Sequence, residues 1–150
     1  MSTATAAAAA TPSFSPGSDS GLLAPTVDKL LTRTQSPWRL TPTGEGLERP
    51  FKFKTFAKTW DFMTAVSLQC KLKNHHPEWT NVYNTTFIRW TTHSPKGLSE
   101  KDVSMASVCD ELAAAFGEVP TEEGDGGASC ELVGRVVGAA GEDCCAPKKK

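Results

Sequence analysis

Apolar and polar residues alternate along the middle of the chain with two different periods, and this predicts both strands and helices. From Arg49 to Lys54 every second residue is apolar, which is typical of a strand with one buried face. Residues 38–40 predict a second short strand, and the Thr-Pro-Thr-Gly sequence at 41–44 predicts a turn. We therefore expect residues 38–40 to pair with residues 51–53 as a hairpin.

Three segments have the residue spacing of helices. Residues 25–33 predict a short helix with Thr26 as its N-cap. Residues 55–73 predict a longer helix with a wide apolar arc, which usually packs on a sheet and on a second partner, most simply another subunit. A third helix follows Ser99, where the sequence resembles a capping box with Asp102 at its third position. Its apolar face is formed by Met105, Val108, Cys109, Leu112 and Phe116.

The order of these elements predicts the fold class. Pro77 favours an extended exit from the helix 55–73, and the alternating residues 81–90 are strand-like, so that one or two strands are expected before the third helix. Strands and helices that follow one another in pairs are typical of an α+β fold. We expect an antiparallel sheet of about four strands with the helices packed on one face.

Composition divides the chain into three parts. Residues 1–21 are rich in Ala, Thr, Ser, Pro and Gly and predict a disordered leader. Residues 22–117 carry the strand and helix patterns and predict one domain. Residues 118–150 contain many glycines and acids, a short apolar stretch at 132–137 and three final lysines, and predict a mostly disordered tail.

The charge and cysteine content exclude several classes of protein. The 150 residues carry a formal net charge of −1, so no basic field indicates direct nucleic-acid binding or an anionic membrane. No apolar run reaches the roughly 20 residues of a membrane helix, and the leader lacks the features of a secretory signal. Five cysteines without a Cys-x-x-Cys pair indicate neither a disulfide framework nor a zinc knuckle. We expect a reduced, cytoplasmic setting, with a nuclear or organellar location left open.

All three histidines lie within nineteen residues, at His75, His76 and His93. Because the pKa of a free histidine is about 6.5, such a cluster suits proton-transfer catalysis near neutral pH. Metal binding is the second interpretation, but adjacent histidines seldom bind one ion together and no carboxylate or cysteine stands at a supporting spacing. The third interpretation is a structural role, which is the more frequent one for an adjacent pair taken alone.

The residues around the histidines resemble the pterin-4a-carbinolamine dehydratase family. The sequence reads Lys71-x-x-x-His75-His76-Pro77, with five residues before Tyr83, nine more before His93 and eight more before Asp102. The flanking matches are Phe51-Lys52-Phe53, Phe56, Phe62-Met63, Val66, Glu78-Trp79, Asn81-Val82, Asn84, Thr92 and Gly97-Leu98-Ser99. The resemblance covers the chain from about residue 25 to residue 116.

The resemblance implies an enzyme, a hydro-lyase that dehydrates 4a-hydroxytetrahydropterin to quinonoid dihydropterin without a metal or an organic cofactor. Such a reaction recycles the pterin of aromatic amino acid hydroxylases. His75 and His93 would be the general acid and base, in an order left open, and His76 would hold or polarise the substrate. The other residues expected to line the pterin site are Asn74, Thr91, Thr92 and Ser94.

Three further positions qualify this expectation. Asp102 matches a family position, and either a functional role or helix capping explains it. Some relatives carry an acid where this chain has Lys71, and a nearby cation would lower the pKa of a histidine. Ser94 also departs from relatives that have an acid directly after the last histidine.

The resemblance also implies partners. Relatives associate as homodimers through sheet edges or as homotetramers through the helix that corresponds to residues 55–73. The alternative to an enzyme is a non-catalytic dimerisation cofactor that binds a homeodomain transcription factor through its helical face. An apolar arc around Trp60 and Met63 would serve that role, whereas His75 and His93 would not.

Overall fold

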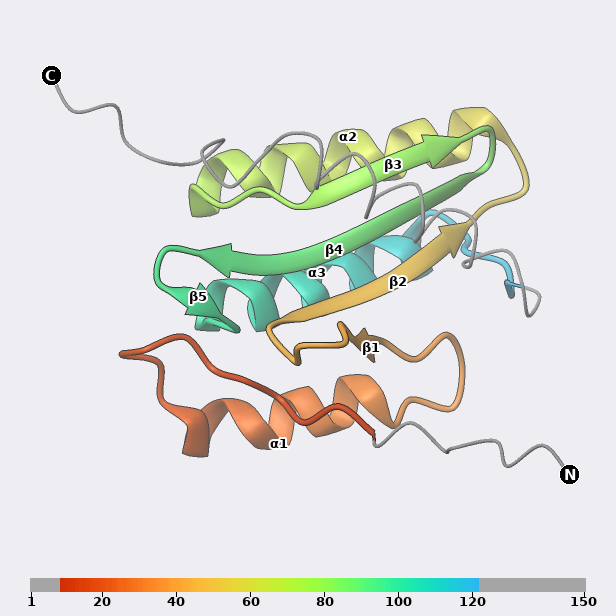
Figure 1. Ribbon diagram of the computed structural model, residues 1–150. Helices are drawn as coiled ribbons and strands as arrows, with labels where there is room; N and C mark the ends of the chain where they lie inside the picture. Colours follow the sequence, from red (N-terminus) through yellow and green to blue (C-terminus); the bar gives the residue numbers. More distant parts are fainter. Residues whose placement is uncertain (1–8, 122–150) are drawn as a thin grey trace, which may run out of the picture.

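A computed structural model describes residues 9–121 and shows a five-stranded antiparallel sheet with three helices (Figure 1). The strands are β1 (Arg39–Leu40), β2 (Gly46–Lys52), β3 (Glu78–Val82), β4 (Thr85–His93) and β5 (Lys96–Gly97). They are ordered β1-β2-β4-β3, and β5 pairs with the end of β4. The expected α+β class is confirmed. Within the described residues no helix is long and apolar enough to span a membrane.

The three helices are α1 (Ser20–Leu31), α2 (Phe56–Lys73) and α3 (Glu100–Ala115). Figure 1 shows α2 and α3 side by side behind the sheet, and α1 packs against α3. The side chain of Thr55 accepts a hydrogen bond from the Lys58 N–H at 3.2 Å and so begins α2. The predicted bounds of α2 and the predicted capping box of α3 are therefore confirmed.

The core lies between the sheet and these helices. Alternate residues of β2 and β4 point toward the helices, as the pleat of a strand requires. Phe51 and Phe53 contact Phe62 of α2, with ring centroids 4.9 and 5.0 Å apart. Other fully buried residues of this core are Val27, Leu47, Val66, Ile88, Trp90, Leu98, Met105, Ala106, Cys109 and Ala113.

The first helix begins earlier than predicted, at Ser20, and includes Pro25 in its interior. Asp19, not Thr26, is the N-cap, and its carboxylate accepts a hydrogen bond from the Leu22 N–H at 3.1 Å. A proline near the start of a helix removes a single backbone hydrogen bond. The extra helical turn buries Leu23 against the core, and this burial offsets the lost hydrogen bond.

Part of the predicted leader belongs to the folded domain. Phe14 forms a parallel bridge with Leu98, and the Ser15 N–H donates to the Leu98 carbonyl at 2.9 Å. At the other end, Val119 forms an antiparallel bridge with Lys52. The folded part therefore extends beyond residues 22–117 at both ends. Residues 1–8 and 122–150, where the rest of the leader and tail predictions fall, lie outside the described residues.

Of the one or two strands expected around residues 81–90, the structure has two, β3 and β4, which form a hairpin. Tyr83 adopts the left-handed conformation with φ 52°, and the chain reverses there. Tyr83-Asn84 lacks the glycine that usually marks such a turn, and the alternating pattern continues through it. The sequence therefore gives no sign of the turn between β3 and β4. The first hairpin also has another register: Leu40 pairs with Leu47, not with residues 51–53.

A buried arginine links β2 to α3 and to the end of the described chain. The guanidinium of Arg49 lies 3.7 Å from the ring centroid of Phe51 and donates to Asp110 at 2.9 Å and to Glu118 at 3.1 Å. The indole N–H of Trp38 also donates to Asp110, at 3.0 Å. These contacts satisfy a charge that would otherwise be costly to bury.

Gly97 provides a test of how the N-terminal segment is held. It has φ 129°, and an added Cβ would lie 2.4 Å from the Ser15 nitrogen. We expect Gly97→Ala to lower the free energy of unfolding by about 1–3 kcal/mol, measured by urea denaturation. Gly117→Ala is the control, since Gly117 also has a positive φ, 81°, but an added Cβ there would meet nothing within 4 Å. Equal losses in both variants would contradict the close packing on Ser15.

Candidate active site

His75 follows α2 directly and is directed by the way this helix ends. Asn74 takes the left-handed conformation at φ 49° and ψ 51°, and the His75 N–H donates to the Cys70 carbonyl at 3.1 Å. This closure turns the chain toward β4. The imidazole stacks on the indole of Trp90 at a centroid distance of 5.6 Å, and its side chain is 13% exposed.

Asp102 contacts the edge of this imidazole. Its carboxylate is fully buried, and Oδ1 lies 2.6 Å from Nε2 of His75. Oδ2 accepts hydrogen bonds from the Thr92 hydroxyl at 2.7 Å and from the Ser99 N–H at 2.8 Å. The capping interpretation of Asp102 is thus confirmed, and the same carboxylate contacts His75. This contact involves Nε2, so Nδ1 is the ring nitrogen that it leaves unused.

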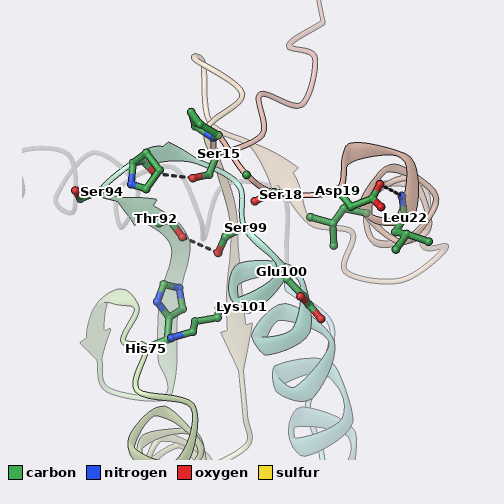
Figure 2. Close-up of a pocket in the computed structure, with 14 residues that line it drawn as sticks. Ser15, Ser18, Asp19, Leu22, His75, Thr92, Ser94, Ser99, Glu100 and Lys101 are labelled. Atoms are coloured by element: carbon green, nitrogen blue, oxygen red, sulfur yellow. Dashed lines mark hydrogen bonds between the residues drawn. The ribbon is translucent and has the colours of Figure 1, made fainter.

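A pocket of about 690 Å³ opens beside these residues, within the range of small-molecule sites (Figure 2). Of the predicted site residues, His75, Thr92 and Ser94 line it. Its other walls come from α3 and from the segment before α1. The remaining lining residues are Ser15, Pro16, Gly17, Ser18, Asp19, Leu22, Leu23, Pro95, Ser99, Glu100 and Lys101.

The wall formed by residues 15–19 was not predicted from the sequence. The Ser15 hydroxyl donates to the Pro95 carbonyl at 2.7 Å, which ties this wall to the loop after β4 (Figure 2). In the sequence these residues share the Ser, Pro and Gly content of the leader. The signal that could have found them is Asp19, an N-cap residue three positions before Leu22.

His93 is the last residue of β4, and it contacts Glu78 rather than Asp102. Its Nε2 lies 3.1 Å from Oε1 of Glu78, and its side chain is 39% exposed. Glu78 also contacts Arg89, at 3.5 Å. Since side chains alternate along a strand, His93 shares its side of β4 with Arg89, whereas Trp90 and Thr92 point toward the helices. His75 and His93 therefore approach the end of the sheet from its two faces.

The other predicted residues surround this region without lining the pocket. Asn74 ends α2, and the exposed His76 has Nδ1 3.4 Å from the Pro77 carbonyl. The Thr91 hydroxyl donates to the Glu45 carbonyl at 2.7 Å. Lys71 is exposed on the last turn of α2. The described residues that line the pocket do not include any of these four residues or His93.

The two cysteines within residues 9–121 are poor candidates for nucleophiles. Burial raises the pKa of the Cys70 thiol to about 11, and burial likewise raises the pKa of Cys109. Both thiols are therefore protonated at neutral pH, and the thiolate is the reactive form. No group of three His, Cys, Asp or Glu side chains in the same part of the chain could hold a metal ion.

Comparison with known proteins identifies the family of this chain. Residues 21–112 match the family model described as pterin 4 alpha carbinolamine dehydratase. This chain belongs to that family. Two proteins named "Putative pterin-4-alpha-carbinolamine dehydratase" are similar to it: one from Afipia carboxidovorans and one from Sinorhizobium fredii. The first is 38% identical over 80 residues, 53% of this chain and 80% of the relative. The second is 40% identical over 77 residues, 51% of this chain and 73% of the relative.

A solved structure has the same fold. The chain is similar to a protein described as transcriptional coactivator/pterin dehydratase from Brucella melitensis, with a TM-score of 0.55 and 30% sequence identity. The match covers 63% of this chain and 96% of that protein. The description of that protein names both a transcriptional coactivator and a pterin dehydratase.

Proposed function

We propose that this protein dehydrates a 4a-hydroxytetrahydropterin to quinonoid dihydropterin in the pocket beside His75. The observation that supports this most strongly is the buried Asp102 carboxylate, 2.6 Å from a histidine that faces a pocket large enough for a pterin. A carboxylate–imidazole pair of this kind fixes the tautomer and the orientation of the ring, as a proton-transfer group requires. The family membership supports the same reaction. The product would return to the pterin cycle of aromatic amino acid hydroxylases.

The reaction needs one proton donor and one proton acceptor. The C4a–O bond breaks as the hydroxyl takes a proton and leaves as water, while N5 loses its proton and its electron pair forms the N5=C4a double bond. In this proposal His75 exchanges one of these protons at Nδ1, because the Asp102 carboxylate contacts the other ring nitrogen. In this proposal the Thr92 and Ser94 hydroxyls, both on the pocket wall, hydrogen bond to the pterin ring.

His93 is the proposed second proton-transfer group. It does not line the pocket itself but directly precedes Ser94, which does, and the Glu78 carboxylate lies 3.1 Å from its Nε2. Because that carboxylate contacts Nε2, Nδ1 is the ring nitrogen left for the substrate. His76, which is exposed at the end of α2, is assigned to holding the substrate at the rim. No metal ion takes part in this scheme.

Titration with 7,8-dihydropterin, a stable relative of the product, tests the location of the site. In two-dimensional NMR spectra of the labelled full chain, we expect the largest shifts at the amides of His75, Thr92 and Ser94. The exposed end of α2 near Lys58 serves as the internal control and should not shift. Shifts confined to other surfaces, or none at millimolar ligand, would contradict the proposed pocket.

A second function, binding of a protein partner, is favoured by one surface. Four large apolar side chains lie exposed along α2: Phe56, Trp60, Leu68 and Leu72, with exposed fractions of 48%, 54%, 57% and 77%. The rings of Phe56 and Trp60 stack on each other at 5.5 Å. Exposed apolar patches of this kind usually mark interfaces. We propose that this surface joins copies of the chain into a homodimer or homotetramer, or binds a transcription-factor partner.

Replacing Trp60 by aspartate should separate the two functions. A charge in the centre of the patch opposes burial there, so we expect Trp60→Asp to shift the protein to a smaller species in sedimentation at micromolar concentration. The dehydration rate per chain should stay within about twofold, since surface substitutions away from a site change little. Lys58→Asp, on another side of α2, is the matched control. A wild type that sediments as a monomer would exclude self-association through this surface.

A further inference from the structure

Charged side chains form a row across the face of the sheet that lies away from α2 and α3 (Figure 1). Arg89 on β4 pairs directly with Glu48 on β2 and with Glu78 on β3. Residues that pair directly in antiparallel strands point to the same face, with their Cβ atoms about 5 Å apart. The register therefore places one positive charge between two negative charges, on the face that also carries His93.

The guanidinium of Arg89 contacts a carboxylate on each neighbouring strand and a ring on its own strand. Its Nε donates to Oε2 of Glu48 at 2.8 Å, and its Nη1 lies 3.5 Å from Oε2 of Glu78. Its central carbon lies 6.0 Å from the ring centroid of Phe87. The side chains of Arg89, Glu48 and Glu78 are 16%, 11% and 14% exposed. A planar cation that is held from several sides and largely shielded from water has little freedom to turn.

Glu78 connects this row to His93. Its Oε2 faces Arg89, while its Oε1 lies 3.1 Å from Nε2 of His93. The ladder between β3 and β4 ends at the pair Glu78–Arg89, so β3 places no residue opposite His93. Because the His93 side chain is 39% exposed, its orientation depends more on a polar contact of this kind than the orientation of a buried ring does.

A carboxylate orients a histidine only if the carboxylate itself is held. A glutamate side chain has several rotatable bonds, and keeping it in one conformation costs entropy. The ionic contact between Arg89 and one carboxylate oxygen of Glu78 favours the conformation in which the other oxygen faces His93. Without that cation, Glu78 can turn toward water, and the imidazole then loses this partner.

We propose that Arg89 is a positioning residue: it fixes Glu78, and Glu78 holds the His93 ring with Nε2 toward the carboxylate and Nδ1 directed away from it. Glu48 holds Arg89 from the other side. The orientation of His93 follows from these contacts alone, whereas its effect on the rate rests on the proposed dehydration. The face of the sheet away from the helices thereby contributes to the site, although none of these four described residues lines the pocket.

The orientation of His93 is measured by NMR in the labelled full chain without any substrate. We expect the three-bond couplings about the Cα–Cβ bond of His93 to show one rotamer in the wild type and averaged rotamers in Arg89→Gln. Lys54→Gln removes a positive charge from an exposed position and is the control, with His93 couplings equal to those of the wild type. Wild-type couplings in a folded Arg89→Gln variant would overturn the proposal.

Glu78→Ala provides the same measurement if Arg89→Gln does not fold. It removes the group that holds His93 and leaves Arg89 paired with Glu48. We expect averaged His93 rotamers in this variant as well. A single wild-type rotamer there would mean that Glu78 does not hold the ring, and would equally overturn the proposal.

A rate measurement tests whether Arg89 acts through His93. In the full chain, Arg89→Gln should lower kcat for dehydration about tenfold and leave KM within about twofold, because a proton-transfer group moves while the pocket is unchanged. In the His93→Ala background the same substitution should change kcat by less than about twofold. Equal losses in both backgrounds would show a general effect on the fold and would overturn the proposal. A wild type without dehydratase activity would contradict the proposed function, and the His93 couplings would still decide the role of Arg89.

Discussion

His75→Ala is expected to lower kcat for dehydration of 4a-hydroxytetrahydropterin by about 10²–10⁴-fold, the usual contribution of a general acid or base. The loss has a specific cause in this structure. Removing the imidazole takes away the proton-transfer group that Asp102 orients at 2.6 Å and leaves that carboxylate buried without this partner. Initial rates at saturating substrate, followed by ultraviolet absorbance, provide the measurement.

Two variants make this result interpretable. Glu111→Ala, at an exposed residue of α3, should retain the full rate and serves as the matched control. His93→Ala should also lower kcat, because the proposed scheme needs a second proton-transfer group. If His75→Ala keeps the wild-type rate and fold, the pocket beside His75 is not the catalytic site.

Arg49→Ala is expected to lower the free energy of unfolding by about 3–5 kcal/mol, the range found when one partner of a buried ion pair is removed. The Arg49 side chain is 1% exposed, and its loss leaves Asp110 and Glu118, at 12% and 13%, without the cation between them. It also removes the group that lies 3.7 Å from the Phe51 ring centroid. Guanidinium chloride denaturation followed by tryptophan fluorescence measures the change.

Arg39→Ala is the control for this prediction. Arg39 is exposed on β1, so its removal should change the free energy of unfolding by less than about 0.5 kcal/mol. A loss below about 1 kcal/mol for Arg49→Ala would mean that water replaces the guanidinium at little cost, contrary to the buried network described.

The sequence predicted the elements whose signals are local. α2 has a threonine cap, a continuous helical pattern and a proline beyond its end, and its bounds agree within one residue. The hairpin at Tyr83 was missed because a non-glycine residue adopts a positive φ there, which the surrounding structure enforces. The start of α1 was missed because burial of Leu23 depends on α3 and the sheet, and no local pattern reveals it.

The candidate site was also predicted only in part, because some of its residues come together through contacts between distant parts of the sequence. His75, Thr92 and Ser94 lie together because the end of α2 lies near the end of β4. The spacing of these residues in the sequence matches the family pattern, so they could be predicted as one site. The wall at residues 15–19 depends on a bridge between Phe14 and Leu98, which are 84 positions apart. The separation of His75 and His93 follows from the pleat of β4, which places His93 on the face away from the helices. The sequence did not predict it, because the predicted strand ended at residue 90, before His93.

The decay of freshly prepared 4a-hydroxytetrahydropterin, with and without wild-type protein at micromolar concentration and with a chelator in parallel samples, tests the central claim most directly. The account predicts that the protein accelerates the loss of water well above the spontaneous rate, to the same extent with and without chelator. A decay identical to the spontaneous one would contradict the proposed activity, and a chelator-sensitive acceleration would contradict its metal-free mechanism.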